Sequence, residues 1–200
     1  MMRIIGILGG VAGGKSTVAE MFARLGAGIL DADRVGHEVL RLPQVEEAAR
    51  QRWGERIFGE DGHIDRCRLA QLVFAPGPLA RQEREYLERL THPEILNLLR
   101  READEMAAAG VKVAVLDAPL LREAGWDELC EKMVFVDCPR EERLRRALSR
   151  GWLEKDFSAR EDAQDSLARK RASADVIIDN SGPIERTQAQ VEQFWTALFR

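Results

Sequence analysis

The stretch Gly9-Gly10-Val11-Ala12-Gly13-Gly14-Lys15-Ser16 decides the fold of this 200-residue chain, because it fits the pattern G-x-x-x-x-G-K-[ST]. An apolar run, Ile4–Leu8, precedes it and indicates a buried strand. Apolar residues at helical spacing follow it as far as Leu25. A strand, a glycine-rich turn and a helix in this order predict a phosphate-binding loop rather than a flexible turn.

The predicted loop assigns chemical roles to its residues. Glycines let backbone N–H groups approach a polyphosphate, and the start of the following helix adds unpaired N–H groups. We expect Lys15 to contact the β- and γ-phosphates of a nucleoside triphosphate and the Ser16 hydroxyl to bind Mg²⁺. The residues expected to bind ATP here are Gly10, Ala12, Gly13, Gly14, Lys15, Ser16 and Thr17.

Composition and charge exclude several other classes of protein. Hydrophobic residues make up 45% and charged residues 32%, as in an ordinary globular domain, and the net charge of −4 argues against nucleic acid as a partner. Cys67, Cys130 and Cys138 are odd in number and lack C-x-x-C spacing, so we expect free thiols in a reducing compartment. No apolar run reaches membrane-spanning length. We therefore expect a cytoplasmic protein without a membrane partner.

Carboxylates follow the ends of predicted strands. Asp31 and Asp33 come directly after a short strand, Ile29-Leu30, and Asp117 ends a strongly apolar strand. Residues at the carboxyl ends of parallel strands face the ligand crevice. We expect one of the first two to cap a helix and the other to be catalytic. Asp117 either approaches Mg²⁺ or only ends its strand, and the Ala118 that follows, in place of a water-activating Glu, favours transfer over hydrolysis.

The middle of the chain is predicted to be a helical insert. Residues 44–110 have helical spacing, so 1–43 and 111–200 would form the nucleotide-binding core. Thr91-His92-Pro93-Glu94 has the order of an N-cap, a first-turn proline and a capping-box glutamate, and predicts a new helix there. In a small kinase such an insert carries the acceptor substrate. His92 either contacts that substrate or packs at the start of the helix.

A run of arginines follows the fourth predicted strand, Met133–Asp137. Arg146 and Arg150 belong to a helix that breaks at Gly151–Phe157, and a capping-box pattern at Ser158 predicts the next helix. This arrangement favours a mobile lid, residues 146–165, over the phosphates, and the alternative is a solvated, salt-bridged face. The predicted fold is α/β: a P-loop NTPase-type, three-layer arrangement with a parallel five-stranded sheet, in which the phosphate loop follows the central first strand.

Over nearly its whole length the chain resembles the dephospho-coenzyme A kinase family. Besides the loop and Asp31-Ala32-Asp33, the resemblance rests on Gly62-His63-Ile64-Asp65-Arg66, His92-Pro93, Asp117-Ala118-Pro119-Leu120-Leu121, Arg146, Arg150, Gln164 with Lys170, and Ala174–Gly182. The chain departs from the family at Arg143, where Gln is frequent, at Arg122, where Phe is common, and at Ser166, which replaces a frequent proline.

The resemblance implies ATP-dependent phosphorylation of the ribose 3′-hydroxyl of dephospho-coenzyme A, the last step of coenzyme A synthesis. It implies that Asp33 is the general base, and we expect Lys15, Arg146 and Arg150 to act with it on the transferring phosphoryl group. The remaining assignments are Asp33, Arg66 and His92 for the acceptor, Asn180 for ATP, and Ser16 and Asp117 for the metal.

Two other functions are compatible with a phosphate loop. Another P-loop small-molecule or nucleoside monophosphate kinase would share the fold and differ only at the acceptor site. A nucleotide-dependent switch should carry an Asn-Lys-x-Asp base-reading motif, which this sequence lacks. We expect a monomeric kinase that uses Mg²⁺ and ATP.

Overall fold

The computed structural model describes residues 2–162 and 164–199, which divide into two compact units. One unit is Met1–Asp31 with Glu102–Arg200, and the other is Ala32–Arg101. The second unit begins earlier and ends earlier than the helical insert that the sequence predicts, 44–110. Its early start reflects local packing, since a Cβ built on Gly36 would contact Ile95 within the same unit.

The first unit is built on a parallel sheet. Within the described residues its five strands are β1 (Arg3–Gly9), β2 (Gly28–Asp31), β3 (Val113–Asp117), β4 (Lys132–Asp137) and β5 (Val176–Asp179), in the order β2-β3-β1-β4-β5. β1 is central, which confirms the predicted fold and places the phosphate loop at the middle of the carboxyl edge. The chain pairs β3 on one side of β1 and β4 on the other, and this switch point is where open α/β sheets bind ligands.

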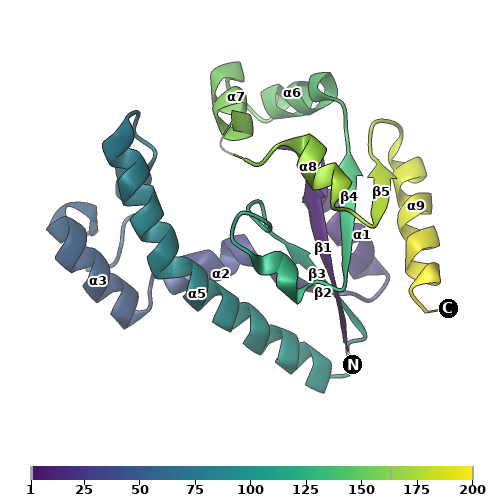
Figure 1. Cartoon of the computed structure of the whole chain (residues 1–200), viewed down its shortest axis with the longest axis horizontal. Coiled ribbons are helices and arrows are strands. Elements are labelled where there is room, and N and C mark those ends of the chain that lie inside the picture. The colour runs from purple at the N-terminus through teal and green to yellow at the C-terminus, as the bar shows by residue number, and fades with distance from the viewer. Residues whose placement is uncertain (1, 163, 200) are drawn as a thin grey trace. The chain divides into compact units, whose positions relative to one another are not determined.

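Apolar side chains between the sheet and its helices form the core of this unit. Helices α1 (Lys15–Arg24) and α9 (Ile184–Ala197) contact each other, and α9 runs beside β5 (Figure 1). Phe22 of α1 is fully buried and lies 6.0 Å from the Phe194 ring in an edge-to-face arrangement. The strands are continuous apolar runs because a parallel sheet is covered on both faces.

Three short helices lie near the end of the sheet toward which the strand arrows point in Figure 1: α6 (Arg140–Ser149), α7 (Glu154–Asp162) and α8 (Leu167–Ala172). The predicted capping box at Ser158 is wrong, because α7 begins at Glu154 and includes Ser158. The Ser158 hydroxyl instead accepts a hydrogen bond from Arg140 Nη2 at 3.3 Å. The earlier start lets α7 bury Phe157 completely.

The second unit is helical and has its own core. It contains α2 (Ala32–Val39), α3 (Pro43–Trp53), the 3₁₀ turn η1 (Gly54–Ile57), α4 (Arg66–Val73) and most of α5 (Pro78–Ala108); a further turn, η2 (Trp126–Leu129), belongs to the first unit. The core residues of this unit are Ala49, Trp53, Ile57, Phe58, Ile64, Leu69 and Val73. Asp65 is the N-cap of α4, because its carboxylate accepts hydrogen bonds from the N–H groups of Cys67 at 2.8 Å and Arg68 at 3.1 Å.

The new helix predicted at Thr91 does not form, because α5 runs unbroken through it with Pro93 in its interior. The Thr91 hydroxyl donates back to the Leu87 carbonyl at 2.8 Å, one turn earlier, instead of capping a helix start. Thr91, Ile95 and Leu99 are buried at a four-residue spacing on both sides of the proline. Continuous packing of one helix face therefore outweighs the lost backbone donor.

No helix in the described part of the chain combines the length and apolar character needed to cross a bilayer.

We predict that Phe22→Ala lowers the free energy of unfolding by about 3–5 kcal/mol, because it leaves a cavity in the core beneath the sheet. The measurement is denaturant unfolding. Leu148→Ala is the control: this side chain is 49% exposed, so its loss should change stability by no more than about 0.5 kcal/mol. Similar losses in the two variants would contradict the assignment of this core.

Candidate active site

The phosphate loop turns directly from β1 into α1. The Gly13 N–H donates to the Gly10 carbonyl at 3.1 Å, and Gly14 adopts a left-handed conformation, with φ of +94°, at the N-terminus of α1. Gly14, at the N-cap position, has no side chain with which to cap this terminus, and exposed helix-start N–H groups of this kind suit an anion. Lys15 folds back along the loop, with Nζ 3.2 Å from the Gly9 carbonyl and 3.1 Å from the Gly10 carbonyl. The loop therefore presents amides and an ammonium group together.

Asn180 and Arg146 hold the loop at Gly13. The Asn180 amide donates to the Gly13 carbonyl at 2.8 Å and is buried, and its oxygen accepts from the Thr187 hydroxyl at 3.1 Å. A Cβ on Gly14 would overlap this amide. Arg146 donates to the carbonyls of Gly13 at 3.5 Å and Asn180 at 2.9 Å. The structure thus places both residues at the loop, bonded to its backbone, and their contact with ATP remains a prediction.

Arg143 is a site residue whose place sequence reasoning missed. Its side chain is only 3% exposed and donates to the Val11 carbonyl at 3.2 Å and the Cys138 carbonyl at 3.1 Å. It also pairs with Glu161 of α7 at 2.6 Å. A signal existed in the sequence: Arg143 lies four residues before Ala147, on the inward face of α6. An arginine at an inward position needs a buried partner.

Asp117 and Ser16 meet where β3 ends. They are hydrogen bonded to each other, and Asp31 is paired in register with Asp117 on the adjacent strand. Burial raises the pKa of Asp117, while the Ser16 hydroxyl and the Lys15 charge partly oppose this. No cluster of three or more His, Cys, Asp or Glu able to hold a metal occurs in the described residues. Hard oxygen donors in small number fit a Mg²⁺-like ion that keeps waters and takes phosphate oxygens as its other ligands.

Asp33 lies in the first turn of α2, in the helical unit, and is exposed. The chain reaches it two residues beyond Asp31 at the carboxyl edge of the sheet. Arg150, by contrast, is the exposed residue that follows the last turn of α6: its backbone N–H bonds to the Ala147 carbonyl at 3.1 Å, but its side chain makes no hydrogen bond or ion pair within the described residues. The predicted lid, 146–165, contains the end of α6 and all of α7; its residue 163 lies outside the described residues.

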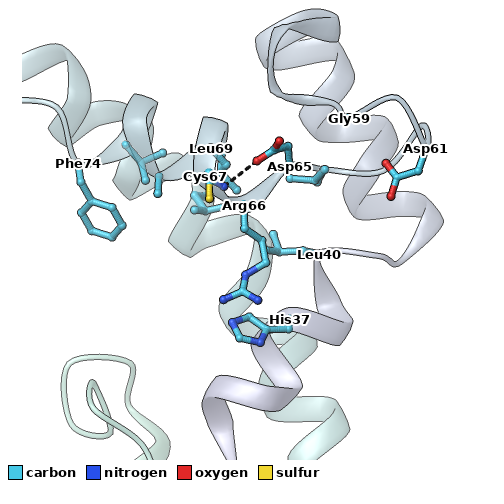
Figure 2. Close-up of a pocket in the computed structure, with 13 residues that line it drawn as sticks. His37, Leu40, Gly59, Asp61, Asp65, Arg66, Cys67, Leu69 and Phe74 are labelled. Carbon is cyan, nitrogen blue, oxygen red and sulfur yellow. Dashed lines mark hydrogen bonds between the residues drawn. The ribbon is translucent and has the colours of Figure 1, made fainter. Parts of the chain in front are cut away.

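The helical unit contains a cavity of about 720 Å³. Figure 2 shows Arg66 extending toward His37 from the start of α4. Apolar side chains that line the cavity include Leu69, Val73 and Leu87. The structure therefore brings Arg66 together with His37, which the sequence analysis did not single out. His92 is not among the residues that line this cavity.

His92 is partly buried on α5, and this burial lowers the pKa of its imidazole, with the Glu88 charge acting in the opposite direction. Its role toward an acceptor remains a prediction.

A strand, phosphate loop and helix at the centre of a parallel sheet, with Lys15 turned back over the loop, define a P-loop nucleotide-binding fold. Comparison with known proteins gives the family. The sequence profile described as dephospho-CoA kinase matches residues 3–186. The dephospho-CoA kinase of Bacillus licheniformis is 39% identical over 196 residues, which cover 96% of this chain and 95% of the relative. The chain belongs to the dephospho-CoA kinase family.

Solved structures share the fold of this chain. The crystal structure of TT1252 from Thermus thermophilus superposes with a TM-score of 0.83 at 32% identity and covers 98% of both chains. The dephospho-CoA kinase from Campylobacter jejuni, at 22% identity, has a TM-score of 0.73 over 99% of this chain and 98% of that one, and supports the fold. The chain is therefore a kinase, and its family implies ATP together with a divalent metal.

We predict that His92 makes the folded protein less stable as the pH falls below about 6.5, the ordinary pKa of the group. The lowered pKa means that the unfolded chain binds the proton more readily, so stability is present at higher pH and is lost as the pH falls toward the folded-state pKa. Urea unfolding between pH 8 and pH 5 should show a shallower pH slope for His92→Gln. Equal slopes in the two proteins would contradict the predicted burial of the neutral imidazole.

Proposed function

We propose that this chain transfers the γ-phosphoryl group of ATP to the ribose 3′-hydroxyl of dephospho-CoA and releases ADP and CoA. The family assignment supports the reaction class. Within the chain, the observation that carries the proposal is the loop with its uncapped helix start and Lys15 directed along it. The direct test is release of ADP against a panel of acceptor alcohols and nucleotides, with dephospho-CoA expected to be strongly preferred.

Phosphoryl transfer requires mainly positioning and neutralisation of charge. In the proposed reaction, Lys15 contacts the β- and γ-phosphates and the loop N–H groups hold the same phosphate oxygens. Ser16 and Asp117 would hold Mg²⁺, which when bound reduces the negative charge on the triphosphate. Arg146, held beside the loop by the Gly13 and Asn180 carbonyls, supplies a further positive charge to the transferring group.

Asp33 is the proposed general base. A base must be accessible to the acceptor hydroxyl, and Asp33 is exposed in the first turn of α2, where the chain has just left the carboxyl edge of the sheet. Asp31 remains in β2, paired in register with Asp117. We assign Asp31 to support of the edge and Asp33 to proton transfer.

The helical unit is the proposed acceptor-binding unit. Dephospho-CoA carries a diphosphate and a long uncharged arm, so it needs a cation and an apolar wall in one cavity. Arg66 and His37 offer the polar contacts, and Leu69, Val73 and Leu87 the apolar ones. We further propose that residues 146–165 act as a lid and that the enzyme is a cytoplasmic monomer with no nucleic-acid partner.

We predict that Asp33→Asn lowers kcat by about 10²–10⁴-fold, the usual contribution of a positioned general base. ATP affinity should change little, because this carboxylate is assigned to the acceptor. The measurement is steady-state kinetics with dephospho-CoA, together with ATP titration. Asp31→Asn is the matched control and should cost much less. If Asp31→Asn were the severely impaired variant, the assignment of the base would be wrong.

We predict unequal effects for the two lid arginines. Arg146→Ala should lower kcat by about 10²-fold, because it removes a donor held beside the loop. Arg150→Ala should cost less, since this side chain begins exposed at the end of α6 and must first be ordered. The measurement is kcat at saturating ATP, with melting temperatures to check folding. A larger loss for Arg150→Ala would reverse this order of importance.

A further inference from the structure

Arg143 is buried beneath the phosphate loop and has no role in the reaction as set out above. We propose that Arg143 is a positioning residue that holds the loop in its anion-binding shape, and that Glu161 of α7 neutralises its charge there. This inference rests on the proposed binding of ATP at the loop.

The guanidinium group contacts the loop over a wide area. A Cβ on Gly10 would lie 2.7 Å from Nη1 and 2.8 Å from Cζ, and a Cβ on Gly13 would lie 3.5 Å from Cδ. Only glycine at position 10 admits this approach. The Arg143 side chain therefore packs directly against the backbone of the loop at Gly10 and Gly13.

The hydrogen bond to the Val11 carbonyl orients the peptide that follows. A trans peptide is planar, so its C=O and N–H groups point in opposite directions. Arg143 Nη1 holds the Val11 carbonyl at 3.2 Å, and this directs the Ala12 N–H away from Arg143. Asn180 does the same two residues later by donating to the Gly13 carbonyl at 2.8 Å, which directs the Gly14 N–H. Carbonyls bonded on one side leave N–H groups for an anion on the other.

The hydrogen bond from Arg143 to the Val11 carbonyl lies next to a strained residue of the loop backbone, Ala12. Ala12 has φ of +56°, a left-handed conformation that costs a non-glycine residue free energy. Such a conformation persists only when its surroundings determine it. The bond at the preceding carbonyl is one such restraint on Ala12.

Glu161 explains how a guanidinium can be buried here. The Arg143 side chain is 3% exposed, and burying its positive charge without a partner would cost much folding free energy. Glu161 Oε1 lies 2.6 Å from Nη1, and the Phe157 ring of the same helix has its centroid 5.6 Å from Cζ. Both partners come from α7, so the packing of α7 on α6 holds Arg143 in place, and Arg143 in turn contacts the loop.

A competing account is that the ion pair only stabilises the packing of α6 on α7. In that case its loss would lower the melting temperature without changing how the folded enzyme binds ATP. The two accounts differ in the equilibrium Kd for ATP, which can be measured by titration with the acceptor omitted.

The test compares Arg143→Met, Arg143→Lys and the double variant Arg143→Met with Glu161→Gln. Methionine keeps apolar packing against Phe157 but donates no hydrogen bond, and we expect the Kd for ATP to rise about tenfold or more, as for loss of a bond from a charged donor. Lysine keeps the positive charge but replaces the planar guanidinium with a single ammonium group, so its Kd should lie between those of the unmodified enzyme and Arg143→Met. KM for dephospho-CoA should be unchanged in both.

The double variant distinguishes the effect of losing the Arg143 hydrogen bond from the effect of leaving the Glu161 charge without Arg143. After Arg143→Met alone, the Glu161 carboxylate faces the loop without this partner and could repel the phosphates. Glu161→Gln removes that charge, so the melting temperature should recover while the Kd for ATP stays raised. Arg140→Gln is the matched control: it removes an exposed ion pair of the same glutamate, at 2.9 Å, and should leave the Kd unchanged.

Two results would overturn the proposal: normal ATP affinity in Arg143→Met, or recovery of affinity in the double variant. Absence of ATP binding by the unmodified enzyme would instead contradict the proposed function. Tight ATP binding without phosphorylation of dephospho-CoA would contradict only the assigned acceptor and would leave the inference on Arg143 supported or overturned by the titrations alone.

Discussion

A phosphate loop can present its N–H groups to an anion only if its carbonyls find donors elsewhere, since a buried carbonyl without a partner is costly. In this protein Gly10 accepts from the Gly13 N–H and Lys15 within the loop region, but the donors to Val11 and Gly13 come from distant parts of the chain. Arg143 holds Val11, and Asn180 with Arg146 holds Gly13. The loop follows the first strand in the sequence, yet its shape depends on residues that follow the fourth and fifth strands. The loop can therefore take up this shape only after β4 and β5 have joined the sheet.

Buried charges organise the segment that covers this edge of the sheet. Besides the pair beneath the loop, Lys170 of α8 is fully buried and lies 2.9 Å from Glu123 in the segment after β3. Burial alone would raise the pKa of Glu123, but the Asp165 N–H and the Lys170 charge lower it below its usual value. Breaking either pair would leave a buried charge without its partner, which is far more costly than loss of a surface pair. These pairs restrict how α7 and α8 can be placed relative to the first unit's sheet.

Much of the fold could be predicted because its signals are local. Continuous apolar runs separated by turn residues indicated the strands, and the loop motif indicated which strand is central. Two local signals misled. Thr91 and Pro93 have the residue types of a helix start, but buried residues one turn apart on both sides of the proline keep α5 continuous. Ser158 and Glu161 have the spacing of a capping box, but Phe157 and Glu161 are both used in packing against α6.

The sequence by itself determined the phosphate loop, the parallel α/β class and the resemblance to one kinase family, because these follow from spacing along a single segment. Only the tertiary structure decided which side chains complete the site. It placed Arg143 beneath the loop, His37 beside Arg66 in the cavity of the helical unit, and Ser16 in contact with Asp117. Such contacts join residues far apart in the chain. Their partners are selected by burial and by hydrogen-bond geometry, neither of which is encoded at a fixed spacing in the sequence.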